Sequence, residues 1–315
     1  MKFDFNQKKY LIIIGLVIFA GLFWGVVLET KAATTVYLDM GEMEKKEIYG
    51  GDIFMVDMKI SSPDKSINVI DGTLIYDSGK LEIKEVSTGG SLFVLWPKPP
   101  VFSDDKGNLS FVGGTPDGFQ GEEGKVLKIA FFAKSEGEAK IDFLDGFLVF
   151  LHDGKGTQIN PWLRPLSLNI LTRSPEIPVK DEWQDLLEKD KTPPEFIEAI
   201  ISSDPHIFDN QYFVSFFAID KESGVSYFEI KEGERDFIRA ESPYLLQDQS
   251  LKSVIQIKAI DKAGNERITE AEIAVPTAPF YKNVLFWIAG FLIIILLVMF
   301  YIFWRNFRRK IKTQK

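Results

Sequence analysis

The sequence predicts an all-β protein with two β-sandwich domains and an apolar segment near each end. Short runs of alternating apolar and polar residues fill most of the chain from residue 34 to residue 275, and this period of two is typical of half-buried strands. Clusters of Gly, Asp and Asn separate the runs, because Gly and Asn tolerate the backbone angles of tight turns. A length of 315 residues is sufficient for about two domains.

The N-terminal segment, residues 1 to 32, predicts a secretion signal. Lysines precede an apolar run from Tyr10 to Leu28, and small residues at Thr30 and Ala32 suit cleavage by a signal peptidase. The run is also nearly long enough to cross a bilayer, so retention as a membrane anchor is the alternative.

The C-terminal segment, residues 283 to 304, predicts a transmembrane helix. The run from Val284 to Trp304 carries no charge and matches the ~20 residues that a membrane helix needs. Six Lys and Arg residues follow in residues 305 to 315, which predicts a basic cytoplasmic tail. The sequence therefore indicates a cell-membrane protein with an extracellular ectodomain, crossing once, or twice if the signal is retained.

The charge and composition of the middle region exclude several classes of protein. The formal net charge is −8 and the two ends together carry +9, so residues 33 to 281 carry −17. An acidic region without a basic stripe argues against nucleic acid as a partner. The chain has no cysteine and two histidines in different predicted domains, which excludes disulfides and makes a His-based catalytic triad hard to assemble.

Residues 33 to 173 predict a nine-stranded sandwich, with "GEEGKV" near residue 124 interpreted as a hairpin turn. The expected strands are Thr35 to Leu38, Ile53 to Ile60, Ile67 to Ile75, Leu81 to Val86, Leu109 to Val112, Val126 to Ala133, Ala139 to Phe143, Phe147 to Leu151 and Leu166 to Leu171.

This region resembles a cohesin module. The similarity is carried by "IFMVDMKI", "GTLIYDSGKLEI", "GNLSFVGG", "GKVLKIAFFAKSEGEAKIDF" and "HDGKGTQI", and above all by Tyr76-Asp77 before a short turn and Leu81-Glu82-Ile83. The resemblance implies a jelly-roll sandwich that captures dockerin modules in cellulosomes or on cell surfaces. Carbohydrate-binding modules share a related sandwich, so a polysaccharide ligand is the alternative.

The resemblance also indicates where a partner protein would bind. Asp71 stands where cohesins often place an acidic dockerin contact, and Thr73 shares its face by two-residue alternation. Thr115 lies in a short stretch where other cohesins present an acid.

The proline-rich stretch "SLFVLWPKPPVF" adds Trp96 as a fourth candidate for partner binding. Its prolines disfavour regular strand pairing, and an exposed aromatic ring could stack on a sugar or anchor a protein interface. The alternative is that these aromatic residues close one end of the sandwich.

Residues 174 to 193 predict a linker, in which Trp183, Leu186 and Leu187 could form one face of a short helix with Asp181 or Lys180 near its start. Residues 194 to 276 predict a second sandwich of about seven strands, because about 80 residues suits an immunoglobulin-like domain. Its "AIDKESGVSYFEI" and "AIDKAGNE" resemble the turns of bacterial Ig-like and fibronectin-like surface domains.

Asp220, Glu222 and Asp261 lie in acidic loops of the second domain and are candidates for a structural calcium site. The alternative is that these aspartates only hydrogen-bond the backbone of their own turns. No other cofactor is expected.

The sequence as a whole predicts a membrane-anchored surface binding or scaffolding protein whose first domain captures a dockerin-like secreted or surface protein. The alternative is a carbohydrate-binding surface module linked to polysaccharide attachment or breakdown. An extracellular hydrolase is disfavoured, because no pair of carboxylates is marked for glycoside hydrolysis, and no enzyme activity is expected.

Overall fold

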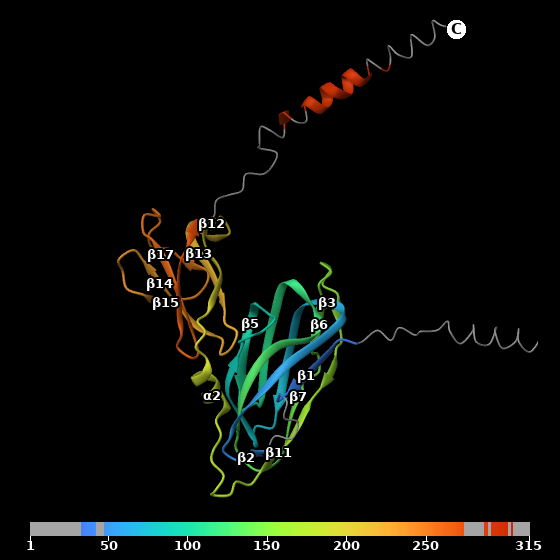
Figure 1. The fold of residues 1–315 in the computed structure, drawn as a ribbon, viewed down its shortest axis with the longest axis vertical. Helices are drawn as coiled ribbons and strands as arrows, with labels where there is room; N and C mark the ends of the chain where they lie inside the picture. The colour runs from blue at the N-terminus through green and yellow to red at the C-terminus, as the bar shows by residue number, and fades with distance from the viewer. Residues whose placement is uncertain (1–32, 42–46, 274–286, 289–290, 302–303, 305–315) are drawn as a thin grey trace, which may run out of the picture.

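A computed structural model shows two β domains lying side by side (Figure 1). The structure describes residues 33–41, 47–273, 287–288, 291–301 and 304. The predicted signal and the predicted basic tail lie outside the described residues, as does part of the predicted transmembrane segment. Residues 291–301 are helical. Among the described residues, no helix has both the length and the apolar character needed to cross a bilayer.

The first domain contains eleven strands of one continuous, strongly bent sheet. They are β1 (Thr35–Asp39), β2 (Ile48–Tyr49), β3 (Ile53–Tyr76), β4 (Leu81–Ser87), β5 (Leu95–Ser103), β6 (Asn108–Ala133), β7 (Gly137–Phe143), β8 (Leu148–Leu151), β9 (Gln158–Ile159), β10 (Trp162–Arg164) and β11 (Leu166–Leu171).

Two long antiparallel strands, β3 and β6, form the frame of this sandwich. The N-terminal half of β3 pairs with the C-terminal half of β6, as in Ile53 with Phe132. The C-terminal half of β3 pairs with the N-terminal half of β6, as in Ile75 with Asn108. Register shifts between Met58 and Val69 mark the bend, so each strand passes from one layer to the other. One layer adds β1, β4 and β10 to the pair, and the other adds β5, β8 and β9.

The core of the first domain lies between the two halves of β3. Alternate residues from both halves are buried in one cluster, including Phe54 and Leu74. Tyr76 packs edge to face on Phe131 with the ring centroids 5.5 Å apart, and its hydroxyl donates to Asp104 Oδ1 at 2.6 Å. The Tyr76 side chain therefore joins the two layers at this end of the sandwich.

The strand-turn-strand unit after Tyr76 is held by Asp77. Its carbonyl oxygen accepts from Lys80 N at 3.0 Å and from Leu81 N at 2.8 Å, and its Oδ1 accepts from Gly79 N at 3.0 Å. Leu81 is completely buried where β4 begins. Asp77 therefore fixes the turn so that the first residue of β4 enters the core.

Two strand predictions need correction. The runs expected at residues 53–60 and 67–75 are one strand, β3, and the runs at 109–112 and 126–133 are one strand, β6. The "GEEGKV" stretch is not a hairpin turn, because Gly121 pairs with Ser62 and Gly124 pairs with Ile60. Backbone pairing thus continues through stretches whose composition indicates turns.

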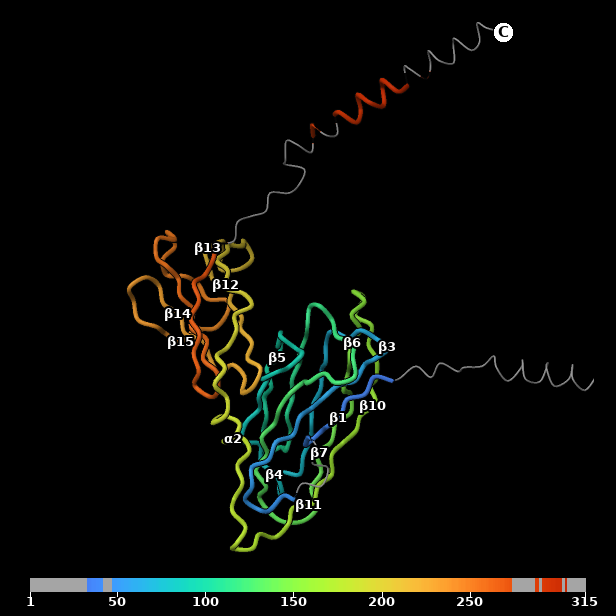
Figure 2. The backbone as a smooth tube through the Cα atoms, viewed as in Figure 1, coloured from blue at the N-terminus to red at the C-terminus, as the bar shows by residue number. Residues whose placement is uncertain are grey.

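The linker forms the expected short helix, α2 (Glu182–Lys189). Asp181 is the N-cap residue, and its side chain accepts from Gln184 N at 2.9 Å. The helix contacts the first domain, since Glu182 Oε2 accepts from Met55 N of β3 at 2.9 Å. Figure 2 shows the chain leaving the first domain near β11 and returning along its side past α2 to the second domain.

Up to residue 273, where its described part ends, the second domain has eight strands rather than the seven expected, arranged as two four-stranded sheets, β16-β13-β12-β19 and β15-β14-β17-β18. They are β12 (Glu195–Asp204), β13 (Ile207–Ile219), β14 (Val225–Glu232), β15 (Ile238–Ala240), β16 (Tyr244–Leu245), β17 (Ile255–Asp261), β18 (Glu266–Glu270) and β19 (Glu272–Ile273). A small core between the sheets includes Val214, Phe216 and Ile257.

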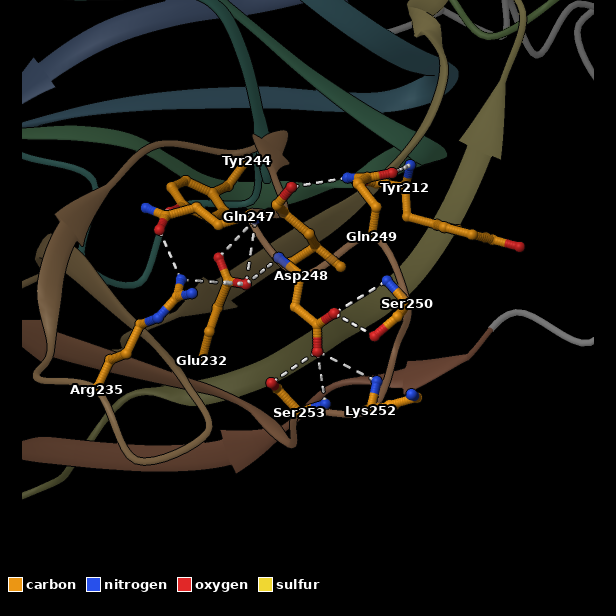
Figure 3. Close-up of polar contacts among 11 residues, drawn as sticks. Tyr212, Glu232, Arg235, Tyr244, Gln247, Asp248, Gln249, Ser250, Lys252 and Ser253 are labelled. Carbon is orange, nitrogen blue, oxygen red and sulfur yellow. Dashed lines mark hydrogen bonds and ion pairs between the residues drawn. The ribbon is translucent and has the colours of Figure 1, made fainter.

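The loop from residue 246 to residue 253 of this domain is held by two carboxylates, in addition to the packing of Leu246 and Leu251 on the small core (Figure 3). The buried Glu232 carboxylate accepts from Gln247 N and from Asp248 N at 2.8–3.1 Å. The Asp248 carboxylate in turn accepts from the N–H and hydroxyl groups of Ser250 and Ser253. These bonds to the charged form hold the pKa of Asp248 well below its usual value.

Candidate functional site

The predicted partner-binding residues Asp71 and Thr73 lie on the solvent side of the layer β8-β3-β6-β5. Asp71 pairs with Leu148 of β8 and with Val112 of β6, and Thr73 pairs with Ser110. Residues directly opposite one another in antiparallel strands project from the same face. We call this the outer face and define it by Val69, Asp71, Thr73, Ile75, Leu95, Lys98, Val101, Ser110, Val112, Leu148 and Phe150.

The outer face combines apolar side chains with few charges. Leu95 is 48% exposed, Val101 is 60% exposed and Ile75 is 36% exposed. Asp71 is exposed near its centre, and the exposed Lys98 lies two strands away. A largely apolar surface with an acid near its centre suits a protein partner that offers complementary apolar and basic groups.

Trp96 does not lie on the outer face. Its ring is half-buried and packs edge to face on Phe93 and Phe111, with centroids 6.3 Å away in each case. Gly113 makes this packing possible, because a Cβ at that position would lie 2.8 Å from the Trp96 ring. The side chain therefore closes part of the core, as the alternative interpretation of the proline-rich stretch expected. That stretch itself is a strand, β5, which pairs with β6 through two register shifts.

Thr115 also lies apart from Asp71. Gly114 pairs with Val69 at the edge of the outer face, and the half-buried Thr115 follows it in the stretch of β6 where the register with β3 is irregular. The structure thus brings together Asp71 and Thr73, turns Trp96 toward the core, and places Thr115 beyond the regular pairing of β3 with β6.

The apolar members of the outer face were not singled out from the sequence. The strands β8 and β5 carry three of them, Leu148, Phe150 and Val101. Their pairing partners on β3 and β6 are distant from them in sequence. Their alternation was visible, but which of the two faces they share with Asp71 depends on strand register. The exposed Trp162, at 70%, was also missed, and it lies on β10 in the other layer.

Two of the three calcium candidates do meet, where the linker and both domains join. Asp220 and Asp261 lie together with Asp190, and one carboxylate oxygen of each residue lies within 4.8 Å of the others. Asp190 is 0% exposed, Asp220 6% and Asp261 2%. We call these three residues the aspartate triad.

Glu222 is not part of the aspartate triad. Its side chain is exposed and accepts from Thr192 Oγ1 at 3.2 Å, while its carbonyl oxygen accepts from the buried Lys128 ammonium at 2.9 Å. The third acid beside Asp220 and Asp261 is Asp190 and not Glu222, which the sequence had indicated. It lies at the end of the linker, 30 residues before Asp220, and no motif spacing connects the two.

Backbone groups orient the carboxylates of the triad. Asp190 accepts from Thr192 N at 3.0 Å and from Ser223 N at 3.1 Å. Asp220 Oδ1 accepts from Glu222 N and Gly224 N, and Asp261 accepts from Asn265 N. Asp220 and Asp261 therefore do hydrogen-bond the backbone of their own turns, as the alternative interpretation expected. Those hydrogen bonds do not explain why three carboxylates converge.

The electrostatics of the triad are unfavourable for three negative charges. Burial raises the pKa of the Asp220 carboxyl above its usual value, and the charges of Asp190 and Asp261 add to this effect, against lowering by two backbone N–H groups. Burial also lowers the pKa of Lys128, the cation that interacts with Asp220 through its charge. Among the described residues, neither Lys128 nor any other Lys or Arg forms an ion pair with the triad.

The first domain packs directly against the triad loops. Gly90 N donates to the carbonyl oxygen of Asp220 at 2.9 Å, and Ser87 Oγ donates to the carbonyl oxygen of Ser223 at 2.6 Å. A Cβ at Gly89 would lie 2.2 Å from Glu222 O, so only glycine allows this approach. The triad thus lies at a junction of the first domain, the linker and the second domain.

Comparisons with known proteins give similarity in structure. No model of a protein family matches the chain, and no characterised protein matches its sequence significantly. Many solved structures that are similar to this chain are cohesin modules.

A non-cellulosomal cohesin from the archaeon Archaeoglobus fulgidus is 20% identical, with a TM-score of 0.37, over 44% of this chain and 92% of its own. The seventh ScaB type I cohesin from Pseudobacteroides cellulosolvens is 21% identical, with a TM-score of 0.37, over 46% of this chain and 97% of its own. A type I cohesin–dockerin complex from Clostridium thermocellum contains a chain that is 17% identical, with a TM-score of 0.37, over 46% of this chain and 99% of its own.

Proposed function

We propose that this chain is a membrane-anchored surface protein whose first domain captures a partner protein on its outer face. The observation that carries the proposal is the position of Asp71 and Thr73 among exposed apolar side chains on one strand layer. The cohesin resemblance of the sequence supports a dockerin-like partner that is secreted or displayed at a surface. Binding rather than catalysis is the role of the domain.

The membrane attachment is part of the same proposal. The uncharged run at residues 284–304 and the six positive charges after it support an extracellular ectodomain and a cytoplasmic C-terminus. Protease added to intact cells should remove the ectodomain and spare a tag placed after Lys315. Loss of that tag from sealed cells would contradict this orientation.

The partner proposal is tested with a charge reversal on the outer face. Full chains in detergent micelles are immobilised and exposed in parallel to secreted proteins and to insoluble polysaccharides. Asp71→Lys should weaken capture of the protein partner by about tenfold, equivalent to about 1.4 kcal/mol, because a central charge contributes to complementarity.

The matched control is Glu123→Lys, which reverses an exposed acid on the half of β6 that belongs to the other layer. This variant should capture the partner as the unaltered chain does. Equal capture by Asp71→Lys, or retention on polysaccharide with no protein captured, would contradict a protein-binding outer face.

A further inference from the structure

We propose that the aspartate triad binds one calcium ion, which orders the junction between the two domains. Three carboxylates that are each at least nine-tenths buried converge within 4.8 Å without an ion-paired cation in the described part of the chain. Three buried negative charges at this distance repel one another strongly unless a cation lies among them. Calcium suits the site because it takes six to eight oxygen ligands, carboxylates above all.

Two buried oxygen atoms at the junction are a second indication of a ligand, independent of the repulsion among the three carboxylates. Asp220 Oδ2 and Ser223 Oγ have no hydrogen-bond partner, although both residues are buried. Asp220 Oδ1 is already occupied by two N–H groups, which leaves Oδ2 available to a cation. Ser223 is completely buried, and its N–H donates to Asp190, so it stands beside the triad. Buried polar atoms are rarely left unpaired in folded proteins.

The donors come from three separate segments. Asp190 ends the linker after α2, Asp220 follows β13, and Asp261 is the last residue of β17. The first domain contacts the same loops through Ser87 and Gly90. A cation held by these segments would therefore stabilise the docked arrangement of linker and domains, and not one loop alone.

The alternative account is a proton on Asp220 in place of a metal. Protonation would relieve the repulsion, but it would give no dependence of stability on calcium. Titration with the metal therefore separates the two accounts.

The test uses the full chain in detergent micelles after treatment with a chelator. Calorimetric titration with calcium chloride should show one binding site, saturating at or below ~10⁻³ M, the range of extracellular calcium modules. At ten times the dissociation constant, calcium should raise the Tm of the second domain by ~5 °C or more. Magnesium chloride at the same concentrations should give neither effect, because magnesium demands a smaller octahedral site and retains its waters.

Asp220→Asn is the decisive variant. It keeps an oxygen for the N–H groups of Glu222 and Gly224 while removing the charge. Calcium affinity should fall at least ~10-fold, since one of three carboxylate ligands is lost. In chelator the variant should unfold at a higher temperature than the unaltered chain, which shows that it folds and that the buried charge was repulsive.

Glu222→Gln is the matched control, because it neutralises an acid in the same loop whose side chain lies outside the triad. It should bind calcium as the unaltered chain does. The proposal is overturned if the unaltered chain shows no calcium binding, if magnesium is equivalent, if Asp220→Asn binds calcium normally, or if Glu222→Gln loses binding.

Discussion

The two domains achieve stability in different ways. Among its described residues, the first domain buries twenty-nine apolar side chains in one cluster, with a chain of edge-to-face aromatic contacts from Phe93 to Phe143. The second domain buries eight apolar residues in its cluster, and four carboxylates lie buried in or beside it, those of Asp190, Asp220, Glu232 and Asp261. The larger domain depends on the hydrophobic effect, whereas the smaller one has a small core and a buried Glu232 carboxylate that accepts from the backbone of Gln247 and Asp248.

This difference extends to the surfaces and loops of the two domains. The first domain has a large core and exposes apolar side chains, among them Leu95 and Val101, on the outer face that we propose for partner binding. The second domain has a small core for its length, and its polar clusters lie at the loops that connect it to the rest of the chain. It is suited to hold a fixed position relative to the first domain.

The largest expected effect is a cavity in the first core. Phe111 is 0% exposed and contacts Trp96 and Phe147, so Phe111→Ala should lower the free energy of unfolding by about 3–5 kcal/mol. Phe216→Ala, the matched change in the second core, should cost less, because that smaller cluster encloses the ring less completely. Chemical denaturation of the full chains measures both. An equal or larger loss for Phe216→Ala would contradict the contrast between the two cores.

The second prediction concerns the buried Glu232 carboxylate shown in Figure 3. Glu232→Ala leaves the N–H groups of Gln247 and Asp248 without their acceptor, which should destabilise the second domain by about 3 kcal/mol. Hydrogen exchange should become faster in the loop from residue 246 to residue 253 and stay unchanged in the first domain. Unchanged exchange in this loop would show that the polar network does not stabilise it.

The third prediction concerns the contact between the two domains at Gly89. A Cβ at Gly89 meets backbone atoms of Glu222 and Gly224, so Gly89→Ala should disrupt the junction at a cost of about 2 kcal/mol. Differential scanning calorimetry should then show two thermal transitions further apart than in the unaltered chain. Gly50→Ala is a suitable control, because a Cβ there meets no atom within 4 Å and the backbone φ is not positive. Superimposable traces for Gly89→Ala and the unaltered chain would mean that the domains do not support each other.

The smallest expected effect is a dependence of stability on pH, measured in chelator. The pKa of Asp220 is raised above 3.8 in the folded state, so the folded chain binds more protons than the unfolded chain between 3.8 and the folded value. The free energy of unfolding contributed by this group therefore increases as the pH falls through that window, and decreases again as the pH rises.

An ion pair of the first domain gives a dependence of stability on pH with the opposite sign. The Lys59 ammonium holds the pKa of Asp39 below 3.8, so the stability from this pair is lost only as the pH falls below that value. The difference between the unaltered chain and Asp220→Asn isolates the first effect, since Asp39 and Asp248 are the same in both. A difference that does not change with pH above 3.8 would contradict the shift assigned to Asp220.

The sequence by itself determined the all-β class, the linker helix and the positions of the acidic loops. Alternation over a few residues specifies a strand, and Asp181 at the start of α2 caps the helix through a contact three residues away. Two-residue alternation also placed Asp71 and Thr73 on one face, and the composition of the loops placed Asp220 and Asp261 in turns. Such features are predictable because their causes lie within one short window of the chain.

Only the tertiary structure decided which distant residues meet. The stretch between residues 60 and 67 has the composition of a turn, yet β3 continues through it because β6 pairs alongside. Trp96 points inward because Gly113, on another strand, leaves room for its ring. Asp190 joins Asp220 and Asp261 because the linker returns along the first domain and ends at the junction. These arrangements depend on strand register and packing between segments far apart in sequence, which no local pattern of residues specifies.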